Sequence, residues 1–194
     1  VEMDPIVRAA LVHYQFETAH PFLDGNGRLG RLLITLMLIN DGVLHSCLFY
    51  PSFQFKKNRS EYYRQLTSVR ERGTYEEWIE FFCNSLLESA KDSVGSLKNL
   101  VDLHNRSTAT ITENLGRTAA NGQRLLGILE EHPIVDTAFI AAQLDIGRST
   151  ASALVKSFEE LGILRPLDES RQRYRQYGYE EYLSILREDA EPIR

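Results

Sequence analysis

A short segment near the start of the chain, residues 20–31, combines the side-chain types that phosphoryl transfer requires. A histidine titrates near neutral pH, so it can accept a proton from a hydroxyl nucleophile. An aspartate offers the hard oxygen ligand that Mg²⁺ prefers, and two arginines three positions apart can bind phosphate oxygens. The two glycines between the aspartate and the first arginine let the backbone approach a ligand closely. These residues are His20, Asp24, Gly25, Asn26, Gly27, Arg28 and Arg31.

Two predicted helices must hold this segment in place. Asp4-Pro5 is a typical helix start, and residues recur at helical spacing from there to His20, where Pro21 ends the helix. A second helix is predicted from about residue 27 to 39, and it is apolar on nearly every side, which is typical of a buried central helix. A loop that leads directly into a helix presents unpaired N–H groups and the positive end of the helix dipole. The start of the second helix is therefore expected to bind phosphate.

Each of these features alone has an ordinary structural explanation, because Gly-Asn-Gly is a common turn and arginines on a helix are often solvated. Together, however, residues 20–31 read HPFLDGNGRLGR. This string resembles, at every fixed position, the motif of the Fic family, His-Pro-Phe-x-(Asp/Glu)-Gly-Asn-Gly-Arg-x-x-Arg. Residues 10–17 also resemble the lead-in helix of that family, and residues 58–63 with Trp78-Ile79 resemble a later segment. The resemblance extends roughly from residue 4 to residue 90.

The resemblance implies an enzyme that uses ATP and Mg²⁺ and transfers AMP to a Ser, Thr or Tyr hydroxyl of a target protein, releasing pyrophosphate. It implies that His20 is the general base, that Asp24 holds Mg²⁺ and that Phe22 is the hydrophobic anchor of the loop. Related proteins transfer other groups or remove AMP, but the kinase-like variants carry lysine where this chain has the first arginine. The nucleotide-binding residues implied are Gly25, Asn26 and Gly27 in the anion hole and Arg28 and Arg31 on the triphosphate.

Other residues with chemical potential are expected to serve the structure. His13 lies two helical turns before His20 and is interpreted as a hydrogen-bonded helix histidine, with ligand contact as the alternative. Glu17 is interpreted as a cap or ion-pair partner rather than an acid. Tyr62, Tyr63 and Trp78 are interpreted as packing residues, although one of them could stack on a nucleotide base.

Two elements of the Fic family are not found in the sequence. The target-docking flap would precede the lead-in helix. The inhibitory motif, (Ser/Thr)-x-x-x-Glu-(Gly/Asn), has one near match at Glu113-Asn114, where Ala109 replaces the hydroxyl residue. We expect these elements to lie N-terminal to residue 1 or on a partner.

The expected fold is mainly α, with a helical Fic core and a small winged helix-turn-helix domain that contains a two-stranded hairpin. Residues 1–90 are predicted to be the C-terminal portion of the Fic core, and residues 91–120 a helical linker. The pattern over about 85–115 is helical but polar, which indicates a linking helical hairpin. The domain boundary is placed at 116–122. Residues 121–182 are predicted to form the winged domain, and residues 183–194 a C-terminal tail.

The winged domain could bind DNA or protein. Basic and hydroxyl residues mark its predicted recognition helix, and arginines mark its hairpin, yet residues 123–182 contain seven basic and ten acidic side chains. A second hypothesis is therefore a nucleotide-sensing transcription regulator with little transferase activity, and a homodimer is a further possible assembly. The residues concerned are Arg148, Ser149, Thr150, Ser152 and Lys156 on the helix and Arg165, Arg171, Arg173 and Arg175 on the hairpin.

Composition limits the remaining function classes. The formal charge of −5 gives no basic field for general nucleic-acid binding. Cys47 and Cys83 have no metal or disulfide spacing and are expected to be reduced thiols. Apolar runs such as residues 36–39 are far shorter than the roughly 20 residues of a membrane span, and no signal peptide opens the chain. A cytoplasmic location without a membrane partner is expected.

Overall fold

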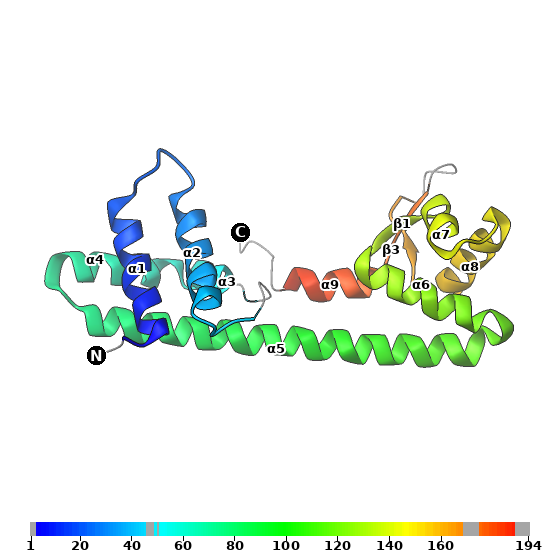
Figure 1. The fold of residues 1–194 in the computed structure, drawn as a ribbon, viewed down its shortest axis with the longest axis horizontal. Coiled ribbons are helices and arrows are strands. Elements are labelled where there is room, and N and C mark those ends of the chain that lie inside the picture. Colours follow the sequence, from blue (N-terminus) through cyan, green and yellow to red (C-terminus); the bar gives the residue numbers. More distant parts are fainter. Residues whose placement is uncertain (1–2, 46–48, 50, 169–174, 189–194) are drawn as a thin grey trace. The chain divides into compact units, whose positions relative to one another are not determined.

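The computed structural model describes residues 3–45, 49, 51–168 and 175–188, in two units that consist mainly of Val1–Gly95 and of Ser96–Glu188. The described residues are mainly helical, and one small antiparallel sheet lies in the second unit (Figure 1). The mainly α fold class is thereby confirmed. Cys47, Arg171 and Arg173, which the sequence singles out, lie outside the described residues.

The two helices predicted around the motif form an adjacent pair in the first unit. α1 (Pro5–Ala19) begins where the Asp4 carboxylate accepts hydrogen bonds from two N–H groups of the first turn, at 2.8 and 3.2 Å, as the sequence predicts. α2 (Asn26–Asn40) follows after a short loop. That loop lies at the end of the helix pair that points away from α5 (Tyr75–Asn114) (Figure 1).

α2 is buried on one face only, so the prediction of a helix buried on all sides is wrong. Ile34 is fully buried and Leu38 is 2% exposed, and both belong to the core of the first unit. The opposite face carries leucines that are about half exposed, namely Leu29, Leu32 and Leu36. The composition of a helix shows how much of it can be buried, but not which neighbours are present to bury it.

The next helical segment is divided into α3 (Ser52–Lys57) and α4 (Arg59–Arg72). The break falls at Asn58, which has φ −104° and ψ 35°. Its side-chain amide donates to the carbonyl oxygen of Gln54 at 3.2 Å. Asparagine favours such local bonds over continued helix, and this explains the break.

The core of the first unit is aromatic and lies between α1, α2, α3, α4 and the first part of α5. Trp78 of α5 is fully buried, and its indole N–H donates to the carbonyl oxygen of Ala10 in α1 at 3.0 Å. Phe55 and Phe82 pack beside it with ring centroids 5.7 Å apart. This packing fixes α1 on α5 and so holds the base of the α1–α2 pair.

α5 runs without a break from Tyr75 to Asn114, where the sequence predicted a helical hairpin over 85–115. The two units divide inside this helix, between Gly95 and Ser96, rather than at residues 116–122. The helix continues because it contains no proline, and its single glycine costs only about 1 kcal/mol. Among the described residues, neither α5 nor any other helix combines the length and apolar character that a membrane crossing needs.

The second unit places helices around a three-stranded antiparallel sheet of order β1-β3-β2. Tyr177 stands at the centre of the sheet, paired with Val135 on one side and with Pro166 on the other. The elements are η1 (Gly116–Thr118), α6 (Ala119–Glu131), β1 (Ile134–Asp136), α7 (Thr137–Leu144), α8 (Arg148–Glu160), β2 (Arg165–Pro166), β3 (Gln176–Gly178) and α9 (Glu180–Glu188).

Two details of this unit differ from the sequence interpretation. The predicted two-stranded hairpin gains a third strand, because residues 134–136 pair with β3 before Asp136 caps α7 through a 2.7 Å bond from the Phe139 N–H. Residues 183–188, expected in the tail, belong to the helix α9.

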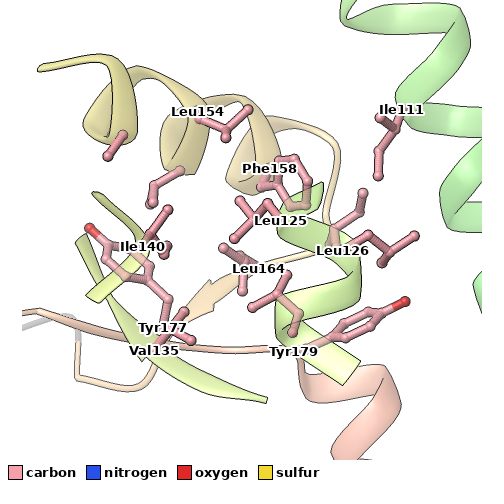
Figure 2. Packing of buried hydrophobic residues seen from close by; sticks show 14 of the residues in the cluster. Ile111, Leu125, Leu126, Val135, Ile140, Leu154, Phe158, Leu164, Tyr177 and Tyr179 are labelled. Carbon is pink, nitrogen blue, oxygen red and sulfur yellow. The ribbon is translucent and has the colours of Figure 1, made fainter. Parts of the chain in front are cut away.

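The core of the second unit collects apolar side chains from every one of its main elements (Figure 2). Phe158 of α8 is fully buried, and so are Leu125 of α6 and Ile140 of α7. Tyr179 is also buried, and its hydroxyl shares a 2.8 Å hydrogen bond with that of Ser107 in α5. The second part of α5 is therefore an integral part of this unit.

Candidate active site

His20 occupies the position where α1 ends. Its backbone has φ 44° and ψ 56°, a left-handed conformation that is uncommon for residues other than glycine, and its N–H donates to the carbonyl oxygen of Phe16 at 3.0 Å. This geometry turns the chain out of the helix at the histidine. The His20 side chain is exposed, so its imidazole is accessible to a substrate.

Asn26 holds the loop closed from the inside. Its side-chain oxygen accepts a 2.9 Å hydrogen bond from the Phe22 N–H, and its amide donates to the Phe22 carbonyl oxygen at 2.6 Å. The residue is 2% exposed. One side-chain donor and the side-chain oxygen of Asn26 are therefore used within the loop, and its backbone N–H lies in the first turn of α2.

Phe22 differs from the expected hydrophobic anchor. Its side chain is 52% exposed and contacts Phe16 of α1 with ring centroids 6.3 Å apart. The backbone of Phe22 is held by Asn26, as described above. The backbone hydrogen bonds, rather than burial of the ring, therefore position this part of the loop.

The N-terminus of α2 is open toward the loop. Gly25 precedes it with φ 81°, a backbone conformation that favours glycine. Within the described residues, no side chain caps this end and its first turn contains no acidic residue. The first N–H groups of α2 are thus free to bind an anion, with the helix dipole in the favourable direction.

Asp24 and Arg28 lie at the surface on either side of this open end. Asp24 Oδ1 accepts a 2.6 Å hydrogen bond from the Gly25 N–H, and Oδ2 lies 3.9 Å from Arg28 Nη2. Their side chains are 96% and 80% exposed. Both are free to reorient toward a ligand, and their pairing at the surface contributes little to stability.

The carboxylate of Asp24 suits a Mg²⁺ ion that is also bound by water and by a substrate's phosphates, rather than an ion held in a cage of protein side chains. Among the described residues, no three His, Cys, Asp or Glu side chains lie together as a metal cage would require. Mg²⁺, however, often uses one or two carboxylates together with waters and the phosphates of a substrate. Asp24 Oδ2 is an exposed carboxylate oxygen beside the open end of α2, so it fits an ion that arrives with a nucleotide.

Arg31 folds back toward the N-terminus of its own helix. A Cβ atom placed on Gly27 would lie 3.2 Å from Arg31 Nη1, so the guanidinium lies over the backbone of Gly27. Side chains on helices lean in this direction. The absence of a side chain at position 27 therefore brings the charge of Arg31 close to the open end of α2.

His13 is a core residue, as the structural interpretation predicts. It is 1% exposed, with Nδ1 2.9 Å from the Gly30 carbonyl oxygen and Nε2 2.9 Å from the Tyr62 hydroxyl. Since a carbonyl oxygen can only accept, Nδ1 carries the proton and Nε2 accepts from Tyr62. Burial lowers the pKa of His13 to about 4, so the ring is neutral near pH 7.

The aromatic candidates divide between the core and the surface. Trp78 and Tyr62 are buried and hydrogen-bonded to α1, so the packing interpretation is confirmed for both. Tyr63 is 51% exposed, and the Arg59 guanidinium lies 5.7 Å from the centre of its ring. The interpretation of Tyr63 stays a prediction.

Glu17 and Gly30 are the two residues of this region whose importance the sequence did not reveal. A Cβ atom at position 30 would overlap Glu17 Oε1 and would lie 3.1 Å from Phe16 and 3.2 Å from His13. Gly30 thus lets α1 and α2 approach closely. Glu17 Oε1 is buried there without a hydrogen-bond partner, which differs from the expected cap or ion pair.

Comparison with known proteins relates this segment to one family. Residues 1–38 match the sequence model of the Fic/DOC family. The chain is 35% identical over 96 residues to protein adenylyltransferase fic-1 of Caenorhabditis briggsae and 34% identical over 100 residues to that of Caenorhabditis elegans, alignments that cover 50% and 52% of the chain. It is 37% identical over 82 residues, 42% of the chain, to protein adenylyltransferase Fic of Drosophila ananassae.

The aligned part covers only 18%, 18% and 15% of these three relatives, so the chain spans less than a fifth of their length. The family-model match itself contains the whole loop from His20 to Arg31. The resemblance to the Fic family that the sequence indicates is thereby confirmed for the segment that contains the candidate site.

Proposed function

We propose that this chain is part of a protein adenylyltransferase that moves AMP from ATP to a Ser, Thr or Tyr hydroxyl of a target protein. One observation carries the proposal: an exposed histidine and an open helix N-terminus are held at opposite ends of one short loop. A base and an anion site at that spacing suit the attack of a hydroxyl on a phosphorus atom. The names of the aligned relatives support the same chemistry.

In the proposed reaction, an imidazole nitrogen of His20 accepts the proton of the target hydroxyl as its oxygen bonds to the α-phosphorus of ATP. The bond from that phosphorus to the bridging oxygen of the β-phosphate breaks, and pyrophosphate leaves. The N–H groups at the start of α2 donate to the phosphate oxygens, and Arg28 and Arg31 bind the rest of the triphosphate. Asp24 would hold a Mg²⁺ ion, which when bound would neutralise phosphate charge.

The assignment of His20 as the base is tested by measuring ATP binding and AMP transfer separately. His20→Ala removes the base but none of the phosphate-binding groups, so ATP affinity measured by calorimetry with Mg²⁺ should change less than about twofold. Transfer of labelled AMP should fall by about a hundredfold or more, the usual contribution of a positioned base. A parallel loss of affinity and transfer would make His20 a structural residue of the loop.

A second candidate function is DNA binding by the second unit, which we propose has winged helix-turn-helix character. The observation that favours it is the outer face of α8, where Arg148, Ser149, Ser152 and Lys156 are all exposed after the turn from α7. A recognition helix carries its contacts on such a face. Together with the nucleotide site, this would make the protein a transcription regulator.

Salt dependence decides between the two roles of the second unit. If α8 and the following hairpin bind DNA, gel-shift affinity should fall steeply between about 50 and 200 mM salt. The double substitution Arg148→Ala and Lys156→Ala should reduce that slope, because each removes a phosphate-binding cation. The absence of any shift on genomic fragments at low salt would leave docking of a protein as the function of this unit.

A further inference from the structure

A carboxylate that the proposed reaction does not use lies beside the candidate site. Glu17 projects from the last part of α1 toward α2, and its Oε1 atom is buried against Gly30 without a hydrogen-bond partner. An unpaired carboxylate oxygen in this position is unfavourable, because burial removes water that would otherwise solvate its charge. Burial accordingly raises the pKa of Glu17 above its usual value, while the charges of Arg31 and then His20 lower it.

Arg31, on the neighbouring helix α2, likewise has a buried polar atom without a hydrogen-bond partner. Its Nε atom is buried without a partner, whereas its Nη1 atom lies over Gly27 beside the open N-terminus of α2. The planar guanidinium therefore has two ends with different surroundings. The Nε edge is buried, and the Nη end lies at the start of α2, where an anion can bind.

The two unpaired atoms belong to opposite charges that interact across the same helix pair. Gly30 stands directly before Arg31, and the absence of its side chain creates the space that the Glu17 carboxylate occupies. A guanidinium N–H that pairs with a carboxylate oxygen forms a strong charge-assisted hydrogen bond.

We propose that Glu17 is a positioning residue for Arg31: its carboxylate attracts the inner edge of the guanidinium and so directs the Nη atoms toward a phosphate bound at the start of α2. The proposal rests on the proposed function in one respect, namely that an oligophosphate binds at this helix end. Glu17 itself does not contact the ligand, and the second unit has no part in the effect.

The direction in which Glu17→Gln changes the affinity for ATP distinguishes positioning of Arg31 from long-range electrostatic repulsion. Glu17→Gln removes a negative charge from the neighbourhood of an anionic ligand, so long-range repulsion alone predicts tighter binding of ATP. Positioning predicts weaker binding, because the guanidinium loses its orienting partner. We expect the affinity for ATP with Mg²⁺ to fall about tenfold, which corresponds to about 1.4 kcal/mol.

The experiment uses the whole chain and a set of matched variants. Glu17→Asp keeps the charge and should retain more affinity than Glu17→Gln. Glu80→Gln makes the same change in net charge at an exposed position of α5 and should leave affinity unchanged. In the Arg31→Gln background, Glu17→Gln should have no further effect, and thermal unfolding of each variant reports whether the fold is intact.

A second readout needs no nucleotide. In ¹⁵N NMR spectra of the free protein, the Nε–H signal of Arg31 should exchange with water faster in Glu17→Gln than in the wild type and in Glu80→Gln. Equal exchange, or ATP binding that is unchanged or tighter in Glu17→Gln, would overturn the positioning role. If the wild-type chain binds no ATP while the Nε–H exchange responds as expected, the proposed function fails and the coupling between Glu17 and Arg31 stands.

Discussion

Asn26 illustrates how a residue of the candidate site can serve the loop that carries the site. Its two hydrogen bonds to the backbone of Phe22 close the loop. His20 and the start of α2 are fixed relative to each other through this closure. The arrangement explains why an amide, with both a donor and an acceptor, stands between the two glycines.

Replacement of Asn26 should therefore affect both stability and site geometry. Asn26→Ala leaves the N–H and carbonyl of Phe22 without their partners, which should cost about 1–3 kcal/mol in the free energy of unfolding. Asn26→Asp keeps the shape and the acceptor but removes the donor to the Phe22 carbonyl oxygen. It should be destabilising as well, measured by urea denaturation at pH 7. A stability equal to wild type in both variants would contradict the closing role.

His13 should make stability depend on pH. Its pKa is about 4 in the folded chain and about 6.5 when exposed, so between these values the unfolded chain binds the extra proton. Stability from this residue is complete above pH 6.5, and it is lost as the pH falls toward 4, by at most about 3 kcal/mol. Urea denaturation from pH 7 to 4.5 should show this loss in the wild type.

The variant His13→Gln provides the comparison for that experiment. It removes the titration, so the difference in unfolding free energy between the variant and the wild type should shrink as the pH falls. Carboxylates such as Glu17 titrate in both proteins and cancel in the difference. A difference that stays constant from pH 7 to 4.5 would show that His13 does not titrate differently in the two states.

At the scale of the residue, the sequence indicates which residues belong to the candidate site better than it indicates what their side chains contact. The resemblance to the Fic motif singles out His20, Asp24 and the two arginines, whose roles stay predictions, but it could not separate the side chain of Asn26 from the backbone that surrounds it. The unpaired Glu17 carboxylate depends on the distance between α1 and α2 at Gly30. Such a distance is set by tertiary packing, and a single sequence carries no direct signal of it.

At the scale of the element, α2 combines two functions on one helix. Its first turn presents N–H groups to the site, and further along Ile34 and Leu38 fix the helix in the core. The Asp4 cap, the stop at Pro21 and the start of α2 were predictable, because each follows from local backbone chemistry. The exposed face of α2, the break at Asn58 and the continuous α5 were not, since they depend on neighbours or on a single local bond.

Two leucines on α2 test whether one face of this helix is buried and the other exposed. Leu38→Ala removes a side chain that is 2% exposed, so it should lower the free energy of unfolding by about 2–5 kcal/mol. Leu36→Ala makes the same chemical change at a position that is 50% exposed, and it should cost less than about 1 kcal/mol. Equal losses in the two variants would mean that the outer face of α2 is covered in solution.

At the scale of the whole molecule, the chain contains two separate hydrophobic cores. One includes Trp78 and Phe82 and supports the candidate site, and the other includes Leu129 and Phe158 and surrounds the small sheet. The division between the two units lies inside α5, between Gly95 and Ser96. Periodicity alone does not show where along one helix the packing partner changes.

The separation of the cores predicts that damage to one leaves the other functional. Leu129→Ala should destabilise the second unit by about 2–5 kcal/mol, because the side chain is fully buried. Hydrogen exchange should then accelerate in α6, α7 and α8, while α1 and α2 keep their protection and ATP affinity is unchanged. A loss of protection in α1 and α2 of the same size would show that the units unfold together.

The most direct test of the proposed chemistry is the intact mass of the chain after incubation with ATP and Mg²⁺, alone and with a lysate of candidate targets. We expect a product heavier by one AMP, on the chain itself or on a target protein, and its absence with His20→Ala. No product should be heavier by a single phosphate, since the α-phosphorus is the proposed point of attack. A phosphate gain, or AMP transfer that persists in His20→Ala, would contradict the proposed reaction.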